Sequence, residues 1–136
     1  NPAMFLQWTR AHLVAGGCLL LAVPNDFAAS QLNVNKSVRR PFWWIDKTHL
    51  NYFNPSSIAN MLGFAGFKIM ERLTLYDVAL FLPKQDYTDD PELGTSIYKE
   101  VIAHDLIMSR GERLWFYATL ARMGLGREII LIAKAI

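Results

Sequence analysis

One segment restricts the fold more than any other: the uninterrupted apolar run Cys18–Val23, which follows Gly16-Gly17 and stops at Pro24. The run is too short to cross a bilayer, which takes about 20 apolar residues. It shows no alternation of apolar and polar residues, and such a run is typical of a strand buried on both faces in the middle of a helix-covered parallel sheet. We therefore expect an α/β fold, with Cys18 as a buried, inert thiol.

The rest of the chain alternates between helical and strand-like patterns. Asn54 suits a helix N-cap and Pro55 the first helical position. Strand-like alternation begins at Phe67 and slips near Met70. The patterns predict helices over Pro2–Leu13, Pro55–Ala65, Ser96–Met108 and Glu112–Met123, ended or broken at Gly16-Gly17, Gly66 and Gly111, and strands over Cys18–Val23, Phe67–Tyr76 and Glu128–Ala135.

Composition and charge exclude several classes of protein. The chain has 136 residues, of which 52% are apolar and 19% charged, so we expect one domain over 1–136 rather than a disordered chain. Its formal charge of +2 is spread along the sequence, which argues against a nucleic-acid groove. No membrane segment is expected, and the three histidines are too far apart for a metal motif. A single cysteine favours a reducing cytoplasm.

Two long segments lack a clear helical or strand period. Residues 24–48 are rich in loop formers, yet they also contain the aromatic pair Trp43 and Trp44. A connection of this length in a compact domain is usually functional or disordered, and its aromatic content argues against disorder. Residues 77–124 begin as a polar stretch and continue as two helices. We expect this segment to form a helical insertion or lid between the last two strands.

Four short motifs, taken in order, resemble the C-terminal half of a class I S-adenosylmethionine-dependent methyltransferase, of the type found among uncharacterised bacterial small-molecule methyltransferases. None of the motifs is specific alone, but their order covers nearly the whole chain. They are Ala15-Gly16-Gly17 leading to Val23-Pro24-Asn25, the segment His49–Phe53 before Asn54-Pro55-Ser56-Ser57, Gly66-Phe67, and Gly124–Ile130.

The resemblance implies a fold and a role. It implies the C-terminal part of a Rossmann-like methyltransferase sheet, with three strands flanked by helices and the last strand antiparallel between the other two. The N-terminal nucleotide-binding half would be missing, so no cofactor-binding residue can be assigned. The intact parent would bind S-adenosylmethionine. This fragment would contribute the acceptor-substrate side, for a small-molecule acceptor, and would be inactive alone.

Three polar residues are candidates for catalysis. Ligands of open α/β sheets bind beyond the carboxyl ends of the strands, where Asn25 and Asp26 are expected. Either could orient an acceptor or take its proton, although Asn-Asp after proline equally suits a simple turn. His49 could be a general base. It could also be a structural histidine that bonds the loop backbone, because the sequence shows no partner for it.

Aromatic residues are the candidates for substrate binding. Phe27, Trp43, Trp44 and Tyr52 could line an acceptor pocket, since aromatic side chains offer large contact areas to sugars and flat rings. Packing of the loop onto the domain is the alternative for the tryptophans, and stapling of the next helix is the alternative for Tyr52.

A non-enzymatic function remains open beside the methyltransferase one. Without a neighbouring strand on its far side, Cys18–Val23 would present an open apolar edge. The chain would then be a non-catalytic α/β domain that binds a partner or forms a homodimer through this edge.

Overall fold

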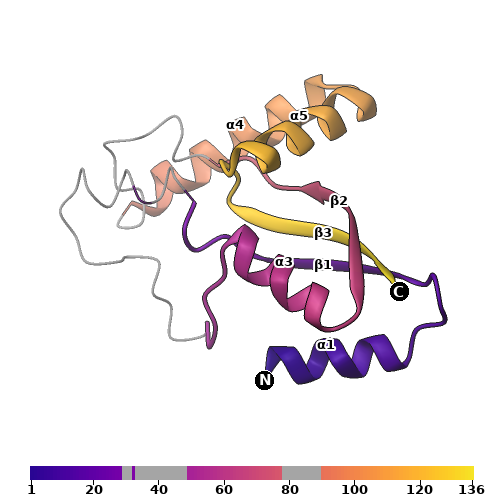
Figure 1. Ribbon diagram of the computed structural model, residues 1–136. Helices are drawn as coiled ribbons and strands as arrows, with labels where there is room; N and C mark the ends of the chain where they lie inside the picture. Colours follow the sequence, from indigo (N-terminus) through magenta and orange to yellow (C-terminus); the bar gives the residue numbers. More distant parts are fainter. Residues whose placement is uncertain (29–31, 33–48, 78–89) are drawn as a thin grey trace.

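A three-stranded sheet forms the centre of the computed structural model, which describes residues 1–28, 32, 49–77 and 90–136 (Figure 1). The strands are β1 (Cys18–Pro24), β2 (Phe67–Leu73) and β3 (Glu128–Ala135), in the order β1-β3-β2. β3 pairs antiparallel with both neighbours, so β1 and β2 run in the same direction and end at the same edge of the sheet. The expected three strands, with the last one reversed between the others, are confirmed.

The hydrophobic core lies on one face of this sheet, under two helices. α1 (Pro2–Ala11) and α3 (Pro55–Phe64) lie on the same side of the strands (Figure 1). Leu6 of α1 and Leu62 of α3 pack with Leu131 of β3, and all three side chains are almost completely buried. The alternation along β3 follows from this arrangement, because every second residue of a strand points toward the covered face.

The opposite face of β1 is open. Two expectations about this strand were therefore wrong: it is not buried on both faces, and Cys18 is not a buried thiol. Cys18, Leu20 and Ala22 are exposed, while the residues between them are partly buried. Leu20 is 68% exposed, and Cys18 is an exposed free thiol rather than a buried one. β1 is an edge strand, and α1 and α3 cover only one of its faces. An apolar run shows that both faces of a strand can be buried, but it does not show which faces other elements cover.

The start of α3 and the bulge in β2 agree with their sequence signals. The Asn54 side chain accepts hydrogen bonds from the backbone N–H groups of Ser56 and Ser57, at 3.0 and 2.8 Å. Ser57 Oγ accepts one from Asn54 N at 3.0 Å, which completes a capping box. The helix ends at Phe64, and Gly66 turns the chain into β2 with φ +83°. The register of β2 shifts between Ile69 and Glu71, where the sequence pattern slips.

The helical hairpin differs from the prediction at both of its boundaries. α4 (Pro91–Ile107) begins at Pro91 rather than Ser96, because the Asp90 side chain caps it by accepting from Leu93 N at 2.9 Å. α5 (Arg110–Met123) begins after Ser109, which forms a capping box with Glu112. The break therefore lies before Gly111, which belongs to the first turn of α5. α5 packs against β2, whereas none of the residues of α4, all of which are described, is buried.

The predicted end of the first helix was also wrong. α1 ends at Ala11, and Gly16, with φ +78°, lies in the turn that leads into β1. Arg10 fixes this region by donating from its guanidinium group to the carbonyl oxygen of Ile136, with Nε at 3.1 Å. Across the described ranges, the structure contains no helix with the length and apolar content needed to span a membrane.

Candidate functional site

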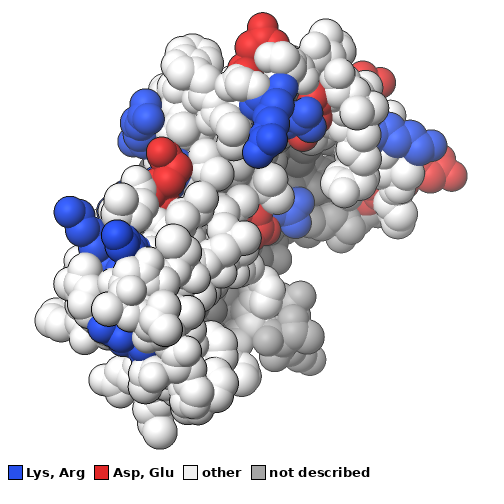
Figure 2. Space-filling view, turned by 90° about the vertical axis from the view of Figure 1, so that its right-hand side faces the viewer, with Lys and Arg blue, Asp and Glu red and all other residues white. Residues whose placement is uncertain are grey.

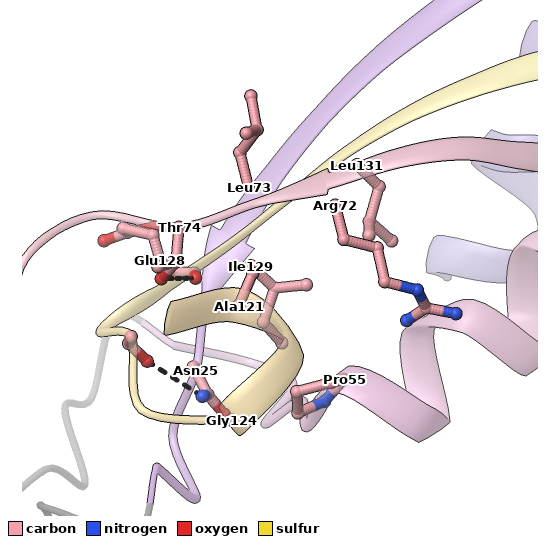
Figure 3. A pocket seen from close by; sticks show the side chains of 11 residues that line it. Asn25, Pro55, Arg72, Leu73, Thr74, Ala121, Gly124, Glu128, Ile129 and Leu131 are labelled. Carbon is pink, nitrogen blue, oxygen red and sulfur yellow. Dashed lines mark hydrogen bonds between the residues drawn. The ribbon is translucent and has the colours of Figure 1, made fainter. Parts of the chain in front are cut away.

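Asn25 connects the carboxyl end of β1 to the turn before β3. Its backbone N–H donates to the carbonyl of Arg127 at 2.8 Å, and its side-chain Nδ2 donates to the carbonyl of Gly126 at 2.9 Å (Figure 3). The residue is 3% exposed. Its Oδ1 atom is buried and accepts no hydrogen bond from any residue in the described part of the chain. Asn25 therefore shapes the edge of the sheet, whichever reaction the site supports.

Asp26 connects the same strand end to the segment before α3. Its backbone N–H donates to the carbonyl of Phe53 at 3.1 Å, and its Oδ2 accepts from Phe53 N at 3.0 Å. The residue is 4% exposed. Because a buried carboxylate is costly unless it is bonded, these contacts hold the segment 49–54 against the end of β1. The turn predicted for Asn25-Asp26 is present, since Ala28 N donates to the Asn25 carbonyl at 3.3 Å, while the Asp26 side chain bonds the segment 49–54.

His49 lies beside the second oxygen of this carboxylate. Its Nδ1 is 3.8 Å from Asp26 Oδ1, with the histidine side chain 37% exposed and the aspartate side chain 5% exposed. The Nδ1 atom itself is buried, and no described residue forms a hydrogen bond with it. The imidazole also contacts Tyr52 edge-to-face, with ring centroids 6.3 Å apart. His49, which has no evident partner in the sequence, is therefore paired with a buried carboxylate.

Glu128 is a further member of the site that the sequence did not indicate. It is the first residue of β3, and the register places it opposite Pro24 at the end of β1. Burial raises the pKa of the Glu128 carboxyl. The positive charge of Arg127 opposes this pKa shift, the Asp26 carboxylate adds to it, and His49 opposes it. In the sequence, Arg127-Glu128 resembles an ordinary solvated pair, and only the antiparallel pairing brings Glu128 to this edge.

A small cavity lies on the covered face of the sheet, between the start of α3 and the end of α5 (Figure 3). Its volume of about 20 Å³ has room for one water molecule and not for an organic acceptor. Asn25, Arg72, Thr74 and Glu128 are among its lining residues. His49 is not among the residues that line this cavity.

Gly126 and Thr74 pack directly against each other at the same edge of the sheet, where β1 and β2 end. Thr74 is 2% exposed, and its Oγ1 donates to the carbonyl of Glu128 at 2.5 Å (Figure 3). A Cβ atom on Gly126 would lie 1.5 Å from Thr74 Oγ1 and 2.2 Å from Thr74 Cβ. Only glycine fits at this position, so the strand ends and the Asn25 contact depend on it.

The remaining site candidates divide into two groups. Phe27 follows Asp26 and is 40% exposed, and Tyr52 contacts the His49 ring and is 36% exposed. Both side chains are accessible to a ligand at the edge. Trp43 and Trp44 lie outside the described residues. The structure thus brings Asn25, Asp26, His49 and Tyr52 into one region, and their assignment to catalysis or substrate binding stays a prediction.

A second cluster of polar and aromatic side chains joins α4, α5 and the end of β2. Tyr117 Oη donates to Asp105 Oδ1 at 2.5 Å, and burial raises the pKa of Tyr117. The rings of Tyr76, His104 and Phe116 lie against one another with centroids 5.6–6.3 Å apart. These contacts fix α4 and α5 to each other and to the segment that follows β2, whereas Trp115 of α5 is exposed.

Charge and ligand-donor patterns add little specificity. On the face shown in Figure 2, Lys and Arg side chains form separate groups, several of them beside Asp or Glu. Among the described residues, no group of three or more His, Cys, Asp or Glu side chains could hold a metal ion.

The described glycine turns do not fit a nucleotide cofactor. Those with positive φ, Gly16, Gly66 and Gly124, all lie in turns that lead into strands. A nucleotide-binding turn instead leaves a strand and starts a helix. Comparison with known proteins does not assign the chain to a family: no family model matches it, and no curated protein sequence is significantly similar to it.

Proposed function

We propose that this chain is the acceptor-substrate part of an S-adenosylmethionine-dependent methyltransferase of the cytoplasm, and that it is inactive alone. The observation that carries the proposal is the strand order β1-β3-β2 with a reversed middle strand. The family that the sequence motifs resemble has the same feature at the C-terminal end of its sheet. The agreement between motif order and strand order supports the proposal more than either does by itself.

The edge formed by β1 and the segment 49–54 suits the acceptor side of such an enzyme. A small-molecule acceptor with a hydroxyl group would bind at the carboxyl end of β1, beside Asp26 and His49. Phe27 and Tyr52 would supply apolar contact area, and Asn25 would hold the strand end in place. The cofactor would be held by residues other than those described, because the described turns do not suit it.

Calorimetry with S-adenosylmethionine tests this proposal. The full-length parent should bind the compound, while the 136-residue chain should give no heat of binding. A parent that fails to bind S-adenosylmethionine would refute the proposal. If the 136-residue chain binds S-adenosylmethionine alone, the cofactor site lies in this chain and not in the rest of the parent.

A second candidate function is self-association through β1, and the contrast between the two sheet edges favours it. β1 carries no charged residue, its pairing with β3 has no bulge, and Leu20 on its open face is 68% exposed. β2, at the other edge, has a bulge and exposed Lys68 and Glu71, the usual protection against strand pairing. An apolar, uncharged strand suits antiparallel pairing with its own copy about a two-fold axis.

Light scattering of the purified chain distinguishes this second candidate. The chain should be a dimer, and Leu20→Lys should convert it to a monomer. Met70→Lys, at the exposed face of the other edge, is the matched control and should leave the dimer intact. A wild-type chain that stays monomeric at high concentration would contradict self-association and leave the methyltransferase proposal unaffected.

A further inference from the structure

We propose that Asp26 and His49 act as a unit: Asp26 positions the imidazole, and His49 accepts a proton at Nε2 from a hydroxyl group of the acceptor. The inference rests on the proposed function, because it names the residue that acts on the acceptor of that site. It is drawn from the geometry of two side chains that lie far apart in the sequence.

The carboxylate of Asp26 is held in place by the main chain of Phe53. Its two oxygens make different contacts. Oδ2 accepts a hydrogen bond from Phe53 N at 3.0 Å, and Oδ1 faces His49 Nδ1 at 3.8 Å. The backbone bond from Asp26 N to the Phe53 carbonyl fixes the same residue a second time. The orientation of Asp26 is therefore set by the main chain, and its Oδ1 atom faces the imidazole.

The imidazole of His49 is buried at the nitrogen that faces Asp26. Its Nδ1 atom is buried, although 37% of the side chain is exposed, so the exposed surface belongs to the opposite part of the ring. A carboxylate can only accept a hydrogen bond. No hydrogen bond spans the 3.8 Å in this structure, but an Nδ1–H suits the facing carboxylate and a bare Nδ1 lone pair would be repelled by it, so we infer that the neutral ring carries its proton on Nδ1 and keeps the lone pair of Nε2. A contact of 3.8 Å in the unliganded protein is consistent with a catalytic pair that tightens when a ligand binds.

The proton transfer itself needs only the acceptor and these two residues. A hydroxyl group placed within about 3 Å of Nε2 can give up its proton to that nitrogen. The electron pair of the broken O–H bond stays on oxygen, which becomes the stronger nucleophile. The positive charge that forms on His49 then faces the Asp26 carboxylate, which stabilises it. Among the described residues of this edge, Glu128 interacts electrostatically with both members of the pair, and Arg127 interacts with Glu128.

The tautomer of His49 tests the inference without any substrate. We would record the imidazole ¹⁵N spectrum of the chain at about pH 9, where an ordinary imidazole is neutral. His12 provides an internal reference, because its Nδ1 lies 2.7 Å from the Trp8 carbonyl and must donate to it. His49 should match this Nδ1–H pattern. Asp26→Asn should shift the tautomer ratio toward Nε2–H by about ten-fold, as expected when a charged acceptor is lost.

Matched measurements keep the test decisive. Glu128→Gln removes the neighbouring charge and should change the His49 tautomer ratio far less than Asp26→Asn does. A wild-type His49 that is mainly Nε2–H would overturn the inference, even if Asp26→Asn failed to fold, and so would a folded Asp26→Asn protein with an unchanged ratio. Calorimetry of the parent with S-adenosylmethionine gives an independent result. If His49 is mainly Nε2–H and the parent still binds S-adenosylmethionine, only the Asp26–His49 inference is refuted. If the parent does not bind S-adenosylmethionine, the proposed function is refuted.

Discussion

Replacing Gly126 with alanine should be the most damaging single-methyl change at the sheet edge. The added Cβ would lie 1.5 Å from Thr74 Oγ1, 2.2 Å from Thr74 Cβ and 2.3 Å from Thr74 Cγ2. All three atoms belong to the stiff, β-branched part of a side chain that is 2% exposed, and rotation about χ1 does not move Cβ, so rotation alone cannot relieve the contact. The backbone at Gly126 or Thr74 must move instead.

The cost follows from what that movement breaks. Overpacking of a buried site costs roughly 1–3 kcal/mol. The Thr74–Glu128 and Asn25–Gly126 hydrogen bonds would also weaken, and each contributes about 1 kcal/mol. We therefore expect the free energy of unfolding to fall by roughly 2–4 kcal/mol. For a chain of this size, the melting temperature should fall by roughly 8–16 °C.

Thermal unfolding followed by far-ultraviolet circular dichroism measures this loss. Gly63→Ala is the matched control, since a Cβ at that helical position has nothing within 4 Å. It should raise the free energy of unfolding by roughly 0.5–1 kcal/mol. If Gly126→Ala melted within about 2 °C of the wild type, a margin below the shift for 1 kcal/mol, the close contact with Thr74 would not exist in solution.

Three further perturbations check separate parts of the structure. Cys18 is exposed, so a maleimide should label the folded chain as fast as the unfolded one; strong protection would mean that the open face of β1 is covered. Asn54→Ala removes the cap of α3 and should lower the free energy of unfolding by roughly 1 kcal/mol in urea titrations, whereas an unchanged value would deny the cap a stabilising role. The raised pKa of Glu128 means that the folded state holds its proton more tightly than the unfolded state, so stability should fall as pH rises above the ordinary carboxyl range. Glu128→Gln should flatten that fall in unfolding curves measured at several pH values, and an equal slope in both proteins would argue against burial of the carboxyl.

Local signals in the sequence predicted local structure well. The Asn54-Pro55 pair marked the start of α3, and the broken alternation near Met70 marked the β2 bulge. Both signals depend on interactions within a few residues, and such interactions are visible in a linear pattern. The same logic was available at Asp90-Pro91, where a capping residue precedes proline, but the polar stretch around it resembles a turn.

Contacts between distant segments could not be predicted in the same way. Nothing near His49 in the sequence identifies Asp26 as its partner, because their meeting depends on how the segment 49–54 folds back against β1. Glu128 reaches the site only through the register of β3 with β1. The exposure of Cys18 depends on which helices cover the sheet, which is a property of the packed layers and not of the strand itself.

The asymmetry between the two sheet edges limits how this chain can be assembled into anything larger. The bulge and the charges of β2 discourage growth of the sheet on that side, while β1 offers a regular and uncharged backbone. A complementing polypeptide would therefore have to pair with the β1 edge of the sheet. This holds for a split-protein reassembly and for a designed fusion. Its added strand would lie next to Cys18–Pro24, with one terminus reaching the corner where Asp26 and His49 meet.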